Sequence, residues 1–366
     1  MSATLRRAST AATTGKALLL AALLTMAVPG SAYAKTADVT VSVPGATMGP
    51  TTGFAEVSSR ADCGRGPVSG GGILQAIGDD ENSNGSHVMG MAPSADGITE
   101  YAGTPGGVGL DAAHWLAFGG TGARSNADLS TTSYAMCLRS NLIRHTQVVM
   151  NNALGPSTSQ SARLVTATCP AGTVLIGGGA RTTPASAGSL KPIASFPTFS
   201  DAEHHFGSIA AGDGENGPDS WTAVGGIGGG RGPDNMTFAY AICGAGGTDL
   251  KHVSTTVRFR EVSGPDTGST GQTATVGCSR ADGQLVSGCA AISGGNVTTT
   301  DFAKATSGGP HLNGSFPSDA AGTPAGDGAS DPSHWTAFTH SGGSASPGSY
   351  SDVWALCLDV RHGHKP

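Results

Sequence analysis

A short polar motif that ends in tryptophan occurs twice in the chain. The two copies are Asp111-Ala-Ala-His114-Trp115 and Asp331-Pro-Ser-His334-Trp335. An aspartate that orients a histidine beside an aromatic ring could serve acid–base catalysis, a metal ion or a sugar-binding platform. A third copy, Gly217-Pro-Asp219-Ser220-Trp221, keeps the tryptophan and lacks the histidine. We therefore favour a turn that delivers the tryptophan to the core, because that interpretation explains all three copies.

Two other strings are similar to calcium-binding sequences. Asp80-Glu-Asn82-Ser-Asn84-Gly85 matches the first half of an EF-hand loop, but its twelfth position is Met91 instead of a glutamate. The segment 229–237 fits one nonapeptide of a calcium β-roll, and such a roll needs tandem copies to hold an ion. We interpret both strings as polar turns, and we expect no metal ion and no cofactor.

The first 34 residues are typical of a cleaved export signal. Arg6, Arg7 and Lys16 form a basic region, an apolar run follows at 17–28, and Ala32-Tyr33-Ala34 supplies the small residues that signal peptidase requires. The apolar run is too short to span a bilayer comfortably, and no later segment reaches that length. We predict a secreted, extracellular protein without a transmembrane segment. An uncleaved N-terminal anchor is the alternative.

The composition narrows the classes of function and fold. The net charge is −6, and loss of a signal that carries only basic residues makes it more negative, so we expect no nucleic-acid partner. Glycine contributes 58 of 366 residues, which disfavours long helices. Short segments rich in valine and threonine, such as 146–150, predict strands between turns.

Two constant intervals divide the rest of the chain into three repeats. The interval from a Gly-Pro proline to a cysteine is 13 residues in each repeat, and the interval from the tryptophan to a second cysteine is 22. The repeats, which we call units 1, 2 and 3, are predicted at 36–141, 142–248 and 249–366. Each has a glycine-rich strand, then a Trp-x-Ala strand apolar on both faces, then a last strand. The sequence predicts an all-β protein with three tandem, similar β-sandwich or barrel-like domains.

The cysteines fit one disulfide in each unit. In an oxidising compartment, a cysteine near the start and one near the end of a unit are expected to pair. The predicted pairs are Cys63–Cys137, Cys169–Cys243 and Cys278–Cys357, each worth about 4 kcal/mol in the chain-entropy model. Cys289 is left over, aligned with Gly71 and Gly178. We interpret it as a buried thiol; a bridge between two chains, or competition with Cys357 for Cys278, is the alternative.

The repeat resembles a module of secreted actinobacterial proteins, which also occurs at the ends of collagen-like and phage-derived proteins. The resemblance is carried by Cys169-Pro-Ala-Gly-Thr-Val-Leu-Ile-Gly-Gly-Gly, by Trp221-Thr-Ala and by Tyr240-Ala-Ile-Cys243. It covers nearly all of the chain after the export signal. Unit 3 departs from it at Cys289 and in its longer segment before Pro317. The family has no assigned activity, so the resemblance implies an extracellular location and no mechanism.

No motif of a known enzyme class is present: the sequence lacks G-x-S-x-G, H-E-x-x-H, P-loop and Cys-x-x-Cys patterns. We predict a non-catalytic binding module that holds a glycan or protein ligand through three equivalent sites. A structural or matrix protein without a ligand site is the first alternative. The second is an unrecognised hydrolase that uses the Asp111–His114 and Asp331–His334 pairs.

Two regions of each unit are candidates for a ligand site, because loops on a rigid scaffold carry most binding functions. One is the turn that bears the tryptophan. Its candidate residues are Asp111, His114, Trp115, Trp221, Asp331, His334 and Trp335. The other is a glycine-rich loop, predicted at 119–133, 225–239 and 339–353.

Overall fold

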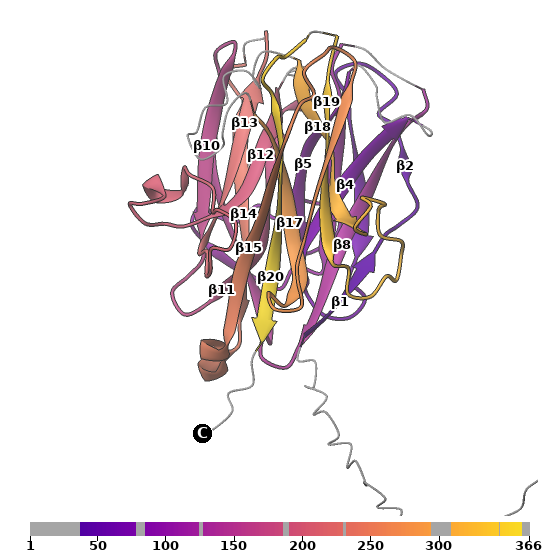
Figure 1. Cartoon of the computed structure of the whole chain (residues 1–366). Helices are drawn as coiled ribbons and strands as arrows, with labels where there is room; N and C mark the ends of the chain where they lie inside the picture. Colours follow the sequence, from indigo (N-terminus) through magenta and orange to yellow (C-terminus); the bar gives the residue numbers. More distant parts are fainter. Residues whose placement is uncertain are drawn as a thin grey trace, which may run out of the picture. The chain divides into compact units, whose positions relative to one another are not determined.

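The computed structural model describes residues 37–77, 85–123, 127–185, 190–229, 232–293, 309–343 and 345–360. These residues belong to one compact unit of the chain, and most of them lie in strands (Figure 1). Within them there is no α-helix; 3-10 helices such as η2 (His205–Gly207) and η3 (Gly247–His252) are short. The predicted all-β fold is confirmed. The export signal predicted at 1–34 lies outside the described residues.

Each unit contributes six strands of similar length in the same order along the chain. In unit 1 they are β1 (Ala37–Ser42), β3 (Glu56–Asp62), β4 (Val68–Ile77), β5 (Ser86–Ser94), β7 (His114–Thr121) and β8 (Leu129–Ser140). In unit 2 they are β9 (His145–Leu154), β10 (Ser161–Thr168), β11 (Val174–Thr183), β12 (Leu190–Thr198), β13 (Ser220–Ile227) and β14 (Met236–Ala245). In unit 3 they are β15 (Val253–Ser263), β16 (Gly271–Gly277), β17 (Gln284–Ser293), β18 (Pro310–Ser318), β19 (His334–Ser341) and β20 (Tyr350–Val360). Unit 1 has two further short strands, β2 (Thr47–Met48) and β6 (Val108–Leu110).

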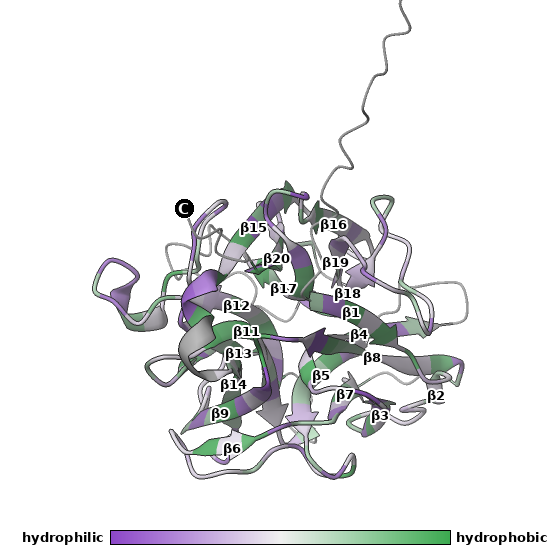
Figure 2. Cartoon of the chain, turned by 90° about the horizontal axis from the view of Figure 1, so that it is seen from below, coloured by the Kyte–Doolittle hydropathy of each residue, from purple (hydrophilic) through white to green (hydrophobic). Residues whose placement is uncertain are grey.

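Three antiparallel sheets result, and each sheet is shared between two units. The main strand orders are β1-β8-β4-β18-β19-β16, β15-β20-β17-β12-β13-β10 and β9-β14-β11-β5-β7-β3. Unit 1 therefore joins unit 3, unit 3 joins unit 2, and unit 2 joins unit 1, which closes a ring of three units (Figure 2). About three sandwich-like units were predicted, and this is confirmed. The sharing of sheets between neighbouring units was not predicted.

Within each unit, the two half-sheets pack through a tryptophan on one and a glycine on the other. The pairs are Gly71–Trp115, Gly178–Trp221 and Gly288–Trp335. The three indole rings are fully buried, with 0% of their surface exposed. A Cβ added to Gly71 would lie 2.6 Å from the Trp115 ring, closer than real Cβ atoms approach a neighbour. Glycine is therefore required at this position by the bulk of the ring that covers it.

The strand register corrects the predicted alignment of Cys289. Cys289 pairs with Trp354, whereas Gly72 pairs with Tyr134 and Gly179 with Tyr240. Cys289 thus occupies the place of Gly72 and Gly179, one residue beyond the glycines with which it was aligned. The error arose because the Val-Ser-Gly sequences of units 1 and 3 look alike but are offset by one residue. Cys289 is a free, buried thiol, as interpreted.

The three predicted disulfides are confirmed. They are Cys63–Cys137, Cys169–Cys243 and Cys278–Cys357. In each unit the first cysteine follows the second strand and the second cysteine lies in the last strand. These strands belong to different sheets, so each disulfide links the two half-sheets of its unit.

The glycine-rich loops were predicted too long. The strands on either side extend into them and leave only 122–128, 228–235 and 342–349 between strands. Gly119 and Gly120 lie within β7, where other side chains occupy the space that a Cβ would need: Thr131 of β8, in the facing sheet, lies against Gly119, and Met89 of the neighbouring β5 lies against Gly120. Glycine here serves close packing inside a sheet and not a flexible loop.

Candidate functional site

Each unit extends a segment over the first strand of the next unit, and we call these segments arms. The arms are 106–111 of unit 1 on β9, 213–217 of unit 2 on β15, and 327–331 of unit 3 on β1. Gly214 N–H donates to Val257 O at 2.8 Å, and Gly328 N–H donates to Val41 O at 2.9 Å. The arm of unit 1 includes β6, which pairs with β9. The arms cover strand edges that would otherwise expose unpaired backbone groups.

The aspartates of the Asp-x-x-His motif hold these arms in place. Asp331 has a left-handed backbone, with φ 50°, and its N–H donates to Val39 O at 2.7 Å. Its Oδ1 accepts a hydrogen bond from Val39 N–H at 3.2 Å. Asp111, with φ 41°, makes the same two bonds with Thr146, at 2.9 and 2.7 Å. Gly217 takes this position in unit 2, since glycine adopts φ 69° without cost.

The two histidines of the motif have other partners. His114 Nδ1 lies 2.6 Å from Asp62 Oδ1, and His334 Nδ1 lies 2.8 Å from Ser333 Oγ. The aspartate and the histidine of each motif thus make separate contacts, in contrast to the paired arrangement that the hydrolase alternative requires.

The three tryptophans of the predicted site lie in the core, so none presents a ring face to a ligand at the surface. Trp221 Nε1–H donates to Ser195 Oγ at 2.8 Å, and Trp335 Nε1–H donates to Ser315 Oγ at 2.9 Å. These contacts agree with the favoured interpretation, in which the turn delivers the tryptophan to the core.

Removing the Asp331 carboxylate should loosen the junction between units 3 and 1. We expect Asp331→Ala to lower the free energy of unfolding by about 2 kcal/mol, because it removes the bond to Val39 N–H and places alanine in a left-handed conformation. Asp331→Asn should have almost no effect, since asparagine keeps the acceptor and tolerates that conformation. Urea denaturation of the two variants measures the difference. Equal losses for both would show that the negative charge, and not the hydrogen bond, holds the arm.

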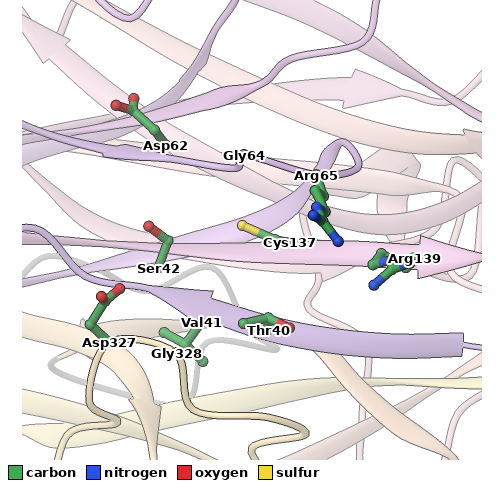
Figure 3. A pocket seen from close by; sticks show the side chains of 10 residues that line it. All are labelled: Thr40, Val41, Ser42, Asp62, Gly64, Arg65, Cys137, Arg139, Asp327 and Gly328. Carbon is green, nitrogen blue, oxygen red and sulfur yellow. The ribbon is translucent and has the colours of Figure 1, made fainter.

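One pocket lies between unit 1 and the arm of unit 3, over the Cys63–Cys137 disulfide. Its volume is about 370 Å³. Arg65 and Arg139 stand toward one end of it, and Asp62 and Asp327 toward the other (Figure 3). Ser42 of β1 lies between Asp62 and Asp327 in this view. The pocket thus offers positive groups on one side and negative groups on the other.

In unit 3, an arginine fills the equivalent place. Ser42 pairs with Ala135 in the same register in which Arg258 pairs with Ala355. The Arg258 guanidinium donates to both carboxylate oxygens of Asp282, at 2.9 and 2.6 Å, and lies 3.5 Å from Asp213. The hydrogen bonds from Arg258 hold the pKa of Asp282 down, at about 2. Serine at position 42 is too short to make these contacts, which leaves the place open in unit 1.

In unit 2, a valine takes the equivalent place. Val149 pairs with Ala241 in the register of Ser42 and Arg258. The arm of unit 1 runs alongside, and Val108 of β6 pairs with Val149, as the arm of unit 3 pairs with β1. The three units have therefore diverged at one position, which is serine in unit 1, valine in unit 2 and arginine in unit 3. A smaller pocket of about 150 Å³ lies beside Cys278.

The charged groups of the pocket differ in how firmly they are held. Asp62 contacts Arg60 Nε at 2.9 Å as well as His114, and Asp327 Oδ1 accepts from Val43 N–H at 2.9 Å. Arg65 and Arg139 are exposed, and no ion pair is found for either among the described residues. The carboxylates are thus fixed by the protein, while the two guanidinium groups are available to an anionic ligand.

The calcium-like strings do not form a site within the described residues. Residues 80–84 lie outside them, as do 230 and 231, while Met91 is a buried residue of β5. Asn235 Nδ2–H donates to Pro156 O at 2.7 Å, which makes it part of a turn. Across the described ranges, no group of three or more histidine, cysteine, aspartate or glutamate side chains is placed to hold a metal ion.

Sequence reasoning did not select Ser42, Arg65, Arg139 or Asp327. These residues gather from β1, a turn, β8 and the arm of another unit. A signal was present: superposing the units by their strand register shows serine, valine and arginine at one position of the first strand. That superposition needs the register, which the sequence spacings alone do not supply.

No protein-family model and no curated protein matches this sequence. The resemblance to the actinobacterial module therefore stays a prediction. In the part of the chain that the structure covers, no helix is long and apolar enough to cross a membrane.

Proposed function

We propose that this is a secreted, non-catalytic binding protein whose ligand is an extracellular glycan that carries carboxylate groups. The pocket above the Cys63–Cys137 disulfide is the observation that carries this proposal. Three disulfides are compatible with an oxidising, extracellular environment.

The arrangement of charge favours an acidic sugar. The planar guanidinium groups of Arg65 and Arg139 suit a carboxylate, to which each can donate two parallel hydrogen bonds. Asp62 and Asp327 accept hydrogen bonds, which suits the hydroxyl groups of the same sugar ring. No aromatic ring is among the described residues that line the pocket, so these residues offer no stacking and a neutral glycan gains little affinity from them. The volume lies at the lower end of the range for small-ligand pockets.

The proposal assigns one pocket of this kind to each chain. The equivalent position is an apolar residue, Val149, in unit 2 and is filled by Arg258 in unit 3. From the repeats, we expected three equal sites that bind one ligand with avidity. Because the three units differ at this position, a single site is favoured instead.

Acidic oligosaccharides test the proposal. We expect saturable binding of oligogalacturonides by calorimetry, and no binding of neutral oligosaccharides of the same length. Arg65→Gln and Arg139→Gln should each weaken binding about tenfold, as expected for loss of a charge-assisted hydrogen bond. Arg163→Gln is the matched control, because Arg163 is an exposed arginine of unit 2 outside the pocket.

Three results would contradict the proposal. Equal affinity of the Arg163 and Arg139 variants would place the site elsewhere. Binding of acidic peptides but not of acidic sugars would favour a protein ligand. Failure of every charged ligand to bind would favour the structural or matrix alternative.

A further inference from the structure

Three basic side chains occupy equivalent positions in the three units, at the beginning of the fourth strand. They are His87 of β5, Lys191 of β12 and His311 of β18. Their partners in the neighbouring strands are Gly120, Gly226 and His340, in the same register each time. Because the units close a ring, these positions are related by a pseudo-threefold axis, and one basic group comes from each unit.

The three side chains are buried. His87, Lys191 and His311 have exposed fractions of 6%, 4% and 5%. The ring centroids of His87 and His311 lie 6.4 Å apart, and those of His311 and His340 lie 5.2 Å apart. A cluster of basic residues with so little exposure is unusual, because burial of a cation without a counter-charge is costly.

Backbone carbonyls fix the orientation of both imidazoles. His87 Nδ1 lies 3.3 Å from Gly85 O, and His311 Nδ1 lies 3.0 Å from Gly309 O. A carbonyl oxygen only accepts, so Nδ1 carries the hydrogen in each ring. The Nε2 atoms of both rings are buried and have no hydrogen-bond partner among the residues that the structure describes. The two ring nitrogens come from different units, and Lys191 of the third unit is near enough for its charge to lower the pKa of both rings.

The cluster has positive character and lacks a negative partner in the described residues. Burial lowers the pKa of Lys191 to about 8. Burial, and then the positive charge of Lys191, lower the pKa of His87 to about 3, and the same two causes lower that of His311. Among the described residues, His340 is a further titratable neighbour, and it lowers the pKa of His311 as well. Near neutral pH the cluster therefore holds one ammonium group and two neutral imidazoles.

An anion would satisfy all three groups, whereas a metal cation would face the ammonium group. We propose that His87, Lys191 and His311 form a binding site for one small oxyanion, of the sulfate or phosphate type. Lys191 donates to the anion directly. Each imidazole takes a proton from solvent at Nε2 and then donates it to the anion, while Nδ1–H stays on its carbonyl. Three donors around an axis match the three oxygens on one face of a tetrahedral oxyanion.

Calorimetric titration of the unaltered protein with sulfate and then with phosphate tests this directly. We expect one sulfate per chain. Titrations in two buffers of different ionisation enthalpy should reveal proton uptake, and binding should tighten as the pH falls from about 8 to about 6, by up to tenfold per pH unit for each proton taken up. Absence of saturable binding, or binding without proton uptake, would overturn the proposal.

Two matched variants locate the site. Lys191→Met keeps the length of the side chain and should abolish sulfate binding, whereas Lys251→Met, which removes an exposed lysine, should leave it unchanged. His87→Gln should retain weaker binding with one proton fewer taken up. If Lys191→Met binds sulfate as the unaltered protein does, only an adventitious surface site is present. This site is separate from the glycan pocket, so Arg139→Gln should leave sulfate binding intact.

Discussion

Replacing Gly178 by alanine should destabilise the protein severely, by about 3 kcal/mol of unfolding free energy. The new Cβ would enter the space of the Trp221 ring and the backbone oxygen of Tyr240. The ring cannot move aside easily, because it is fully buried and its Nε1–H is bonded to Ser195. Chemical denaturation followed by far-UV circular dichroism measures the loss.

Gly45→Ala is the matched control for that variant. A Cβ at Gly45 meets no atom within 4 Å, so this change should alter stability by no more than about 0.5 kcal/mol. The backbone at both glycines lies outside the left-handed region, so alanine can adopt either conformation and the comparison isolates packing. If the two variants have the same free energy of unfolding, the packing of Trp221 does not require glycine at position 178.

Loss of one disulfide should have an effect of the same size. We expect the double variant Cys169→Ala with Cys243→Ala to lose about 4 kcal/mol, because the bridge closes a long segment of chain and links two sheets. Urea denaturation without reductant gives the value. Unit 2 is suited to this test because neither cysteine lines the glycan pocket.

Cys289→Ala provides the comparison for the disulfide variant. This cysteine is buried and free, so its loss should cost only about 1 kcal/mol from the small cavity that it leaves. A reductant should then destabilise the Cys289 variant and the unaltered protein by equal amounts. If Cys289→Ala proves as damaging as the double variant, the thiol takes part in a bridge that this structure does not contain.

The sequence predicted the features that depend on residues close to one another along the chain. The interval from Pro156 to Cys169, and from Trp221 to Cys243, recurs in every unit, and such repetition predicts both the disulfides and the delivery of tryptophan to the core. The strands were predicted from short segments rich in valine and threonine, which are local features as well. The prediction of a loop at Gly119 and Gly120 was wrong, since both glycines lie inside β7. A local sequence pattern does not show that a side chain from another strand occupies the space where a Cβ would be.

The candidate pocket depends on contacts between units, which no local pattern encodes. Ser42 and Asp327 come together because the arm of unit 3 lies on β1 of unit 1. The pairing of strands across the whole ring decides which strand edge a segment covers. Strands of similar composition do not identify their partners. The same limit applies to His87, Lys191 and His311, which meet only when the ring has closed.

Closure of three similar units into a ring has an evolutionary meaning. The shared sheet and the arm that join units 1 and 2 have counterparts between units 2 and 3 and between units 3 and 1, which is the arrangement of a cyclic homotrimer. A gene for one such subunit, duplicated twice and fused in frame, would keep that interface in a single polypeptide. After fusion, the three copies can also differ in sequence. In a homotrimer, Arg258 would appear three times or not at all; in the fused chain, one copy holds an arginine there, another a serine and the third a valine, so the three places differ in chemistry.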